Sequence, residues 1–312
     1  MLSRSIHGRW GWFYVVWLLL LTNKQPVFAA THSISIKGSD TMLLLTQKWV
    51  HEFSKRHSDV AFQISGGGSG IGFAALQNNT TDLCAASRPI KPKEILSCIK
   101  AFSAAPKEYK VCLDAIAVYV HPDNPIRDLD LKTLKDIYTG RITNWRQVGG
   151  MDLDIVLYSR ENSSGTYEFF KSSVMRHEDF SPATLSMPGT SAVMQAVAKD
   201  IGGIGYGGAV FGSVVKTLAL KASVDGPAIL PNANSVQQGD YPIWRHLFHY
   251  VNPAMDKGML GDYLKWIRSP VAQSLAEGSG YFPLPETAQI SDLGDCCLEP
   301  AELASSKRSN QE

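Results

Sequence analysis

The stretch "VAFQISGGGSGIGFAALQ", residues 60–77, decides the fold class. Apolar residues alternate with polar ones at its start, which is typical of a half-buried strand. Three glycines follow and permit a tight turn, and the small and apolar residues after them favour a helix. A strand, a glycine turn and a helix in direct succession indicate an α/β fold with a mostly parallel sheet.

The same order recurs between residues 33 and 220. The segment "SISIKGSD" (33–40) reads as a strand ending in a turn, and residues 41–57 read as an amphipathic helix. We expect further strands at 81–90, 112–125, 154–159, 202–208 and 241–251. We expect further helices around 131–140, 165–174, 190–200, 258–269 and 270–278.

Both ends of the chain differ from this pattern. Arg4 and Arg9 precede the apolar run "WGWFYVVWLLLL", and small residues follow at Ala29 and Ala30. Because this run is shorter than the roughly 20 apolar residues that span a bilayer, residues 1–30 are predicted to be a cleavable signal peptide. We therefore expect a periplasmic protein. Residues 285–312 are polar and aperiodic, which predicts a disordered tail.

Charge and cysteines exclude several functions. The formal net charge is +1, and the sequence shows no basic cluster that would indicate binding to nucleic acid. The five cysteines have no zinc-site spacing, so we expect neither a metal nor a cofactor. Cys98 and Cys112 flank a short polar loop and are candidates for a disulfide, whereas Cys84 lies in an apolar run and is expected to be a buried thiol. Cys296 and Cys297 lie in the tail, and an odd total leaves at least one thiol free or intermolecular.

Four turns follow predicted strands and are rich in hydrogen-bond donors: "GSDTM" (38–42), "SGGGSG" (65–70), "ASRPI" (86–90) and "SRENSSGT" (159–166). The carboxyl ends of parallel strands lie along one edge of a sheet, so these turns are expected to converge there. Helix N-termini, hydroxyl groups and the guanidinium fork of Arg160 together suit an oxyanion. Ser, Thr and Asp are also ordinary helix caps, but their joint occurrence favours an anion site.

Motifs for enzyme chemistry are weak. The run "GGGSGIG" lacks the Lys-Ser/Thr pair of a nucleotide P-loop, and "GIGYGG" at 203–208 fits the dinucleotide pattern only by letter. No histidine shares a motif with Asp and Ser, as a hydrolytic triad would favour. We therefore predict no catalytic residue and no enzyme. A secreted phosphatase remains an alternative, and it would need a metal cluster or an activated nucleophile.

Seven motifs occur together in a characteristic order: "KGSDTM", "SGGGSGIG", "DLCAASRPI", "LKDIYTGRITNWRQVGG", "SRENSSGT", "GGIGYGG" and "YPIWRHLF". Over about residues 33–284 the chain resembles the periplasmic phosphate-binding proteins of ABC phosphate transporters. The resemblance implies a type II, Venus-flytrap fold: two α/β lobes with mixed, mainly parallel sheets flanked by helices, and a ligand cleft between them. One lobe would comprise residues 31–114 and 221–284, and the other residues 115–220.

The resemblance also implies the site and the partners. Inorganic phosphate would be the ligand, the membrane subunits of an ABC transporter would be the partner, and the protein would be a monomer. The implied phosphate contacts come from three turns, and they are Thr41, Met42, Ser69, Gly70, Arg160, Ser164, Gly165 and Thr166.

One position departs from the family pattern. The best-known members carry an aspartate where this chain has Arg88, and that aspartate accepts the proton of hydrogen phosphate and so rejects sulfate. An arginine cannot accept a proton, so the acceptor must come from elsewhere, with Asp40 and Glu161 as candidates. We expect Arg88 and Asp40 among the phosphate contacts. A stand-alone binder of sulfate-like oxyanions and a phosphate sensor remain alternatives.

Overall fold

The computed structural model describes residues 32–285. The predicted signal peptide, nearly all of the predicted tail and both Cys296 and Cys297 lie outside the described residues. No helix within residues 32–285 is long and apolar enough to cross a membrane.

A mixed sheet runs through the molecule in the order β2-β1-β3-β10-β4-β8-β6-β7, and β9 and β5 branch from β4. Pairing is parallel among β1, β2 and β3 and among β6, β7 and β8, whereas β10 and β4 pair antiparallel with each other and with their neighbours. The strands are β1 (His32–Gly38), β2 (Val60–Ser65), β3 (Leu83–Ala86), β4 (Lys107–Val120), β5 (Asp128–Asp130), β6 (Val156–Arg160), β7 (Leu185–Met187), β8 (Gly203–Gly208), β9 (Lys216–Lys221) and β10 (Trp244–Val251).

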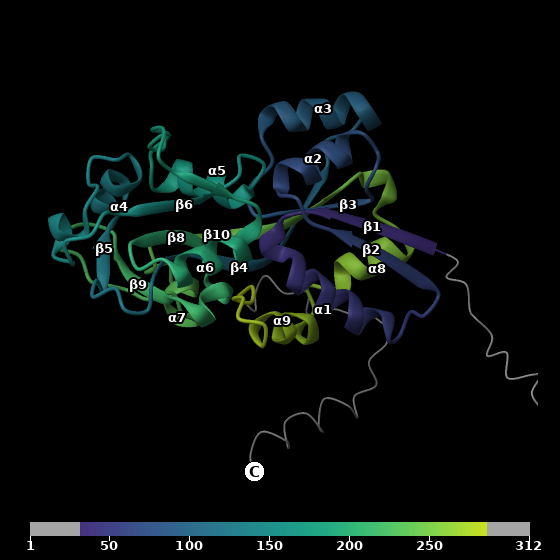
Figure 1. Ribbon diagram of the computed structural model, residues 1–312. Helices are drawn as coiled ribbons and strands as arrows, with labels where there is room; N and C mark the ends of the chain where they lie inside the picture. Colours follow the sequence, from purple (N-terminus) through teal and green to yellow (C-terminus); the bar gives the residue numbers. More distant parts are fainter. Residues whose placement is uncertain (1–31, 286–312) are drawn as a thin grey trace, which may run out of the picture.

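Helices flank this sheet (Figure 1). The α-helices are α1 (Leu43–Ser54), α2 (Ser69–Gln77), α3 (Pro92–Phe102), α4 (Leu131–Tyr138), α5 (Gly165–Ser173), α6 (Gly189–Lys199), α7 (Ala233–Gln237), α8 (Gly258–Trp266) and α9 (Pro270–Glu277). The 3₁₀ helices are η1 (Asp40–Met42), η2 (Trp145–Val148), η3 (Ala209–Val214) and η4 (Pro253–Met255).

Strands β4 and β10 join the two halves of the molecule. The 14-residue β4 pairs with β10 through Lys107–Ala115 and with β8 through Ile116–Val120. Its residues from Val111 onward are all buried. A single strand therefore serves both lobes.

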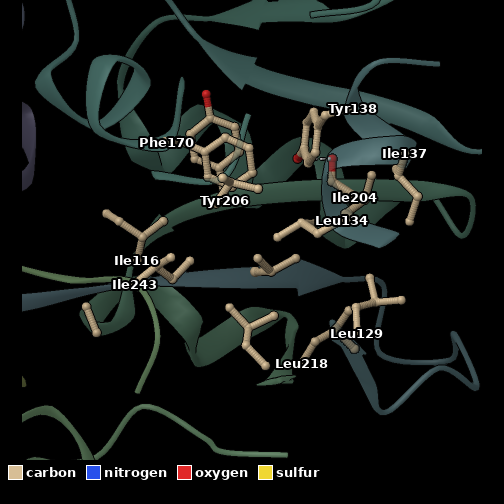
Figure 2. Packing of buried hydrophobic residues seen from close by; sticks show 14 of the residues in the cluster. Ile116, Leu129, Leu134, Ile137, Tyr138, Phe170, Ile204, Tyr206, Leu218 and Ile243 are labelled. Atoms are coloured by element: carbon tan, nitrogen blue, oxygen red, sulfur yellow. Dashed lines mark hydrogen bonds between the residues drawn. The ribbon is translucent and has the colours of Figure 1, made fainter. Parts of the chain in front are cut away.

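Each lobe has its own hydrophobic core. The core of the first lobe contains Trp49, Phe53 and Tyr263, which come from α1 and α8. The core of the second lobe contains Tyr138, Phe170 and Tyr206 among many aliphatic side chains. Figure 2 shows Tyr206 stacked on Phe170, with ring centroids 3.8 Å apart and planes at 8°. The predicted two-lobed α/β fold is confirmed.

The division of the chain between the lobes follows from these cores. Val236, Tyr241 and Ile243 pack into the second core, and the Tyr241 hydroxyl donates to Ile116 O at 2.8 Å. We therefore propose that the second lobe extends to about residue 243, beyond the predicted limit at residue 220.

The predicted disulfide between Cys98 and Cys112 is wrong, because both are free thiols. Cys98 lies in α3 and packs in a small cluster with Phe73, whereas Cys112 lies in β4 and faces the core of the first lobe. Cys84 is a buried free thiol, as predicted. Burial raises the pKa of the Cys98 thiol to about 11, so this thiol is neutral at physiological pH.

Candidate functional site

The predicted turns lie where the two lobes meet. Thr41 and Met42 lie in η1, directly after β1, and both are buried. Gly67 and Gly68 have positive φ and lead into α2, which begins at Ser69. Arg160 is the last residue of β6, and Ser164 is the N-cap of α5. The prediction that these turns open helices is confirmed.

The lobes touch directly at this place. The Gly70 amide of the first lobe donates to Ser163 O of the second at 2.9 Å. A Cβ on Gly165 would lie 2.4 Å from Ser69 Oγ, so only glycine permits this approach. At the rim, Lys91 Nζ and Glu168 Oε2 form an interlobe ion pair of 2.7 Å.

Arg160 is the centre of the site, with only 1 % of its surface exposed. Its Nη1 donates to Thr190 Oγ1 at 2.7 Å, and its Nη2 donates to Asp40 Oδ2 at 2.8 Å and to Glu161 Oε1 at 3.1 Å. Its Nε is buried and has no hydrogen-bond partner within the described residues. A buried guanidinium with a donor to spare suits a ligand rich in acceptors.

Several of the predicted hydroxyl groups lie where the two lobes meet. Thr41 Oγ1 and Thr166 Oγ1, one from each lobe, form a hydrogen bond of 2.9 Å. Ser164 Oγ caps α5 by accepting from the amides of Thr166 and Tyr167, and Ser69 Oγ accepts from the Ser87 amide at 3.0 Å. A hydroxyl that accepts still holds its own proton to donate. Ser164 therefore acts as a helix cap and keeps its own proton available for donation. Ser69 Oγ also lies 3.3 Å from Ser87 Oγ, and either hydroxyl could be the donor in that bond.

Two predicted amide donors already have backbone acceptors. The Met42 amide donates to Ser39 O at 3.1 Å within the turn, and the Gly70 amide bonds across the interface as described above. Of the remaining predicted contacts, the structure brings Thr41 to Thr166, Ser69 to Gly165, and Asp40 to Arg160.

Arg88 pairs with a carboxylate on α3. Its Nη1 and Nη2 donate to the two carboxylate oxygens of Glu94 at 2.8 and 2.7 Å, and its guanidinium lies 4.7 Å from the centre of the Phe73 ring. Its Nε is buried and has no hydrogen-bond partner in the part of the chain that the structure describes. The expectation that Arg88 contacts the anion stays a prediction.

Asp40 accepts hydrogen bonds from both lobes. It binds Arg160 through Oδ2, while its Oδ1 accepts from the Gly67 amide at 2.8 Å. Glu161 binds Arg160 through Oε1, but its Oε2 is buried and has no partner within residues 32–285. Two carboxylates thus flank the arginine, and one of them has a free acceptor oxygen.

A buried ion pair beneath the site was missed by the sequence interpretation. Arg245 on β10 is paired with Asp114 on β4, with Nη2 to Oδ2 at 2.7 Å. Burial raises the pKa of the Asp114 carboxyl, and the adjacent Arg245 opposes this rise. The sequence carried a signal for the pair, since Asp114 is an acid within the apolar run "CLDAIAVYV" and a buried acid needs a partner.

Comparison with known proteins places this geometry in a family. The model of the PBP superfamily domain matches residues 25–271. The chain belongs to the PBP superfamily. This superfamily member is 30 % identical to the phosphate-binding protein PstS of Pseudomonas aeruginosa over 281 residues, which is 85 % of this chain and 87 % of that protein. It is 31 % identical to PstS of Staphylococcus aureus over 267 residues, with coverage of 83 % and 80 %.

Solved structures of similar fold agree with this result. One is a putative phosphate ABC transporter substrate-binding protein from Clostridium perfringens with bound phosphate, with a TM-score of 0.75, 25 % identity, and coverage of 81 % of this chain and 100 % of that one. An ABC-type phosphate transport receptor from Vibrio cholerae matches in fold, with a TM-score of 0.65, 24 % identity and the same coverage. The predicted resemblance to phosphate-binding proteins is confirmed, and these relatives are named as binding proteins, not enzymes.

Proposed function

We propose that this protein binds inorganic phosphate between its two lobes and delivers it to a membrane ABC phosphate transporter. The observation that carries the proposal is Arg160: a buried arginine with an unused Nε, at the junction where Thr41 and Thr166 meet from opposite lobes. The phosphate-binding relatives support the same ligand.

Phosphate would act by replacing direct contacts between the lobes. Its oxygens would accept from Arg160, from the hydroxyls of Thr41, Ser69, Ser164 and Thr166, and from amides at the starts of α2 and α5. Because these donors belong to both lobes, bound phosphate favours the closed arrangement over the open one. The transporter would then distinguish loaded from empty protein by the position of the lobes.

The choice of phosphate over sulfate requires an acceptor for the proton of hydrogen phosphate, and we assign this role to Glu161. Both Asp40 oxygens already accept hydrogen bonds, whereas Oε2 of Glu161 is buried without a partner among the described residues. A bare carboxylate would repel a dianion, and a proton shared between the two removes that repulsion. Sulfate has no proton to share, so the repulsion between its charge and the Glu161 carboxylate would remain.

Calorimetric titration tests this function. Mature protein is unfolded and refolded to remove bound ligand, and phosphate is titrated in the absence and in the presence of excess sulfate. We expect tight phosphate binding that sulfate does not disturb. Equal binding of both anions would indicate a general oxyanion binder. Binding of neither would indicate that the donor-rich turns only cap helices and bind no anion.

Further parts of the proposal concern chemistry and location. The protein would bind its ligand without covalent chemistry, so a chromogenic phosphate ester should not be turned over. It would act in the periplasm as a monomer, after removal of residues 1–30. Steady hydrolysis of the ester by purified protein would favour a phosphatase instead.

A further inference from the structure

Arg245 and Asp114 form a rigid unit in the strands that join the lobes. They are direct register partners on β10 and β4, with 3 % and 2 % of their surfaces exposed. Nε and Nη2 of Arg245 donate to the same oxygen, Asp114 Oδ2, at 3.0 and 2.7 Å. A guanidinium held by two hydrogen bonds in a well-packed strand pair has little freedom to turn.

The other side of this guanidinium reaches the proposed phosphate donors of both lobes. Nη2 donates to Thr166 Oγ1 at 3.0 Å and, more weakly, to Thr41 Oγ1 at 3.5 Å. Nη1 donates to Gly165 O at 3.4 Å. Arg245 therefore donates hydrogen bonds to the Thr41 and Thr166 hydroxyls at the point where the lobes meet.

These contacts constrain the hydroxyl protons. A guanidinium has donors only, so each threonine oxygen must act as an acceptor toward Arg245. Neither hydroxyl proton is therefore directed at Arg245. The bond between Thr41 Oγ1 and Thr166 Oγ1 uses one of the two protons, and the other points away from both partners. A ligand that approaches from that side meets a donor and must offer an acceptor.

We propose that Arg245, fixed by Asp114, is a positioning residue that orients the Thr41 and Thr166 hydroxyls so that the one proton not used between them points toward the anion. This inference rests on the proposed phosphate function. The ion pair has no net charge, so its long-range attraction for an anion is small. The pair therefore affects anion binding by orienting the Thr41 and Thr166 hydroxyls.

A double-mutant cycle separates this role from a structural or purely electrostatic one. The pair is neutralised as Arg245→Gln with Asp114→Asn, because Arg245→Gln alone would leave a buried carboxylate without a partner. This double variant is made in the wild-type chain and in a Thr166→Val chain. Phosphate affinity is measured by calorimetry, and the free energy of unfolding of each ligand-free protein is measured in urea.

We expect the neutralised pair to lower phosphate affinity about 10-fold or more in the wild-type chain, as for the loss of a hydrogen bond to a charged group. In the Thr166→Val chain the same change should lower affinity less than about 3-fold, since the main hydroxyl on which Arg245 acts is already gone. Equal losses in both chains would overturn the proposal, and so would no loss in the wild-type chain.

A matched control is a second ion pair of β4, between Lys107 and Asp256. Lys107→Gln with Asp256→Asn removes a pair for which the structure gives no contact with either threonine. We expect this control to leave phosphate affinity within about 3-fold of wild type. A loss as large as that at Arg245 would show that any ion pair on β4 matters, and would contradict the specific role.

The proposed function and this inference fail in different ways. If wild-type protein does not bind phosphate, the proposed function is wrong. The coupling between the Arg245 pair and Thr166 is then calculated from the free energies of unfolding of the four ligand-free proteins. Coupling between the Arg245 pair and Thr166 in the ligand-free protein would still support the hydroxyl contact. Additive effects on stability would contradict it.

Discussion

Arg160→Gln tests the centre of the proposed site. Glutamine has an amide that can still donate to Thr190 or Asp40, but it lacks the positive charge and the paired N–H donors of the guanidinium group. An anion that accepted two charge-assisted hydrogen bonds from Arg160 would lose about 1.5–3 kcal/mol for each. The expected loss is about 3–6 kcal/mol, and phosphate affinity should therefore fall by about 10² to 10⁴-fold.

The assay is calorimetric titration of phosphate, with urea unfolding of the same ligand-free sample to confirm that it is folded. Arg146→Gln is the control, because Arg146 also pairs with an acid, Asp152 at 3.0 Å, but lies largely exposed on the second lobe. The control should bind as the wild type does. A folded Arg160→Gln protein with affinity within about 3-fold of wild type would refute the site.

Three further changes have defined outcomes. Glu161→Gln should reduce the preference for phosphate over sulfate about 10-fold or more, since an unmet acceptor costs about 1–3 kcal/mol; if Asp40→Asn does so instead, the acceptor has been assigned to the wrong carboxylate. Burial lowers the pKa of His249 from 6.5 to about 3, so the unfolded chain binds the proton first as pH falls and stability is lost below pH 6.5. At pH 5 this loss is about 2 kcal/mol relative to pH 8, and urea unfolding of His249→Leu should show a correspondingly weaker pH dependence between these values. Lys91→Met, which breaks the exposed interlobe pair with Glu168, should change phosphate affinity less than about 5-fold, and a larger change in calorimetry would mean that this rim pair controls closure.

Much of the fold could be predicted because its signals are local. The strand, glycine turn and helix of residues 60–77 need only neighbouring residues, and the structure has β2, Gly67 and Gly68, and α2 in these places. The turn containing Arg160 was found in the same way, from donors next to a strand end. Such features depend on spacing along the chain.

Features that depend on packing were harder to predict. The pairing of Arg88 with Glu94 depends on the placement of α3, and spacing does not reveal it. Cys98 and Cys112 are close in sequence but face different cores. Arg245 pairs with Asp114, 131 residues away, through the register of two antiparallel strands. Only the unusual acid in an apolar strand could have suggested a partner.

The path of the chain through the two cores indicates an order in which those cores form. Most residues of the second core come from the continuous segment between β4 and Ile243. The first core includes Trp49 but also Leu247, Tyr263 and Tyr281, so it closes only when segments from both ends of the described chain come together. Because contacts distant in sequence form late, we expect the first core to be completed after the second. In a protein that acts in the periplasm, both steps would follow export.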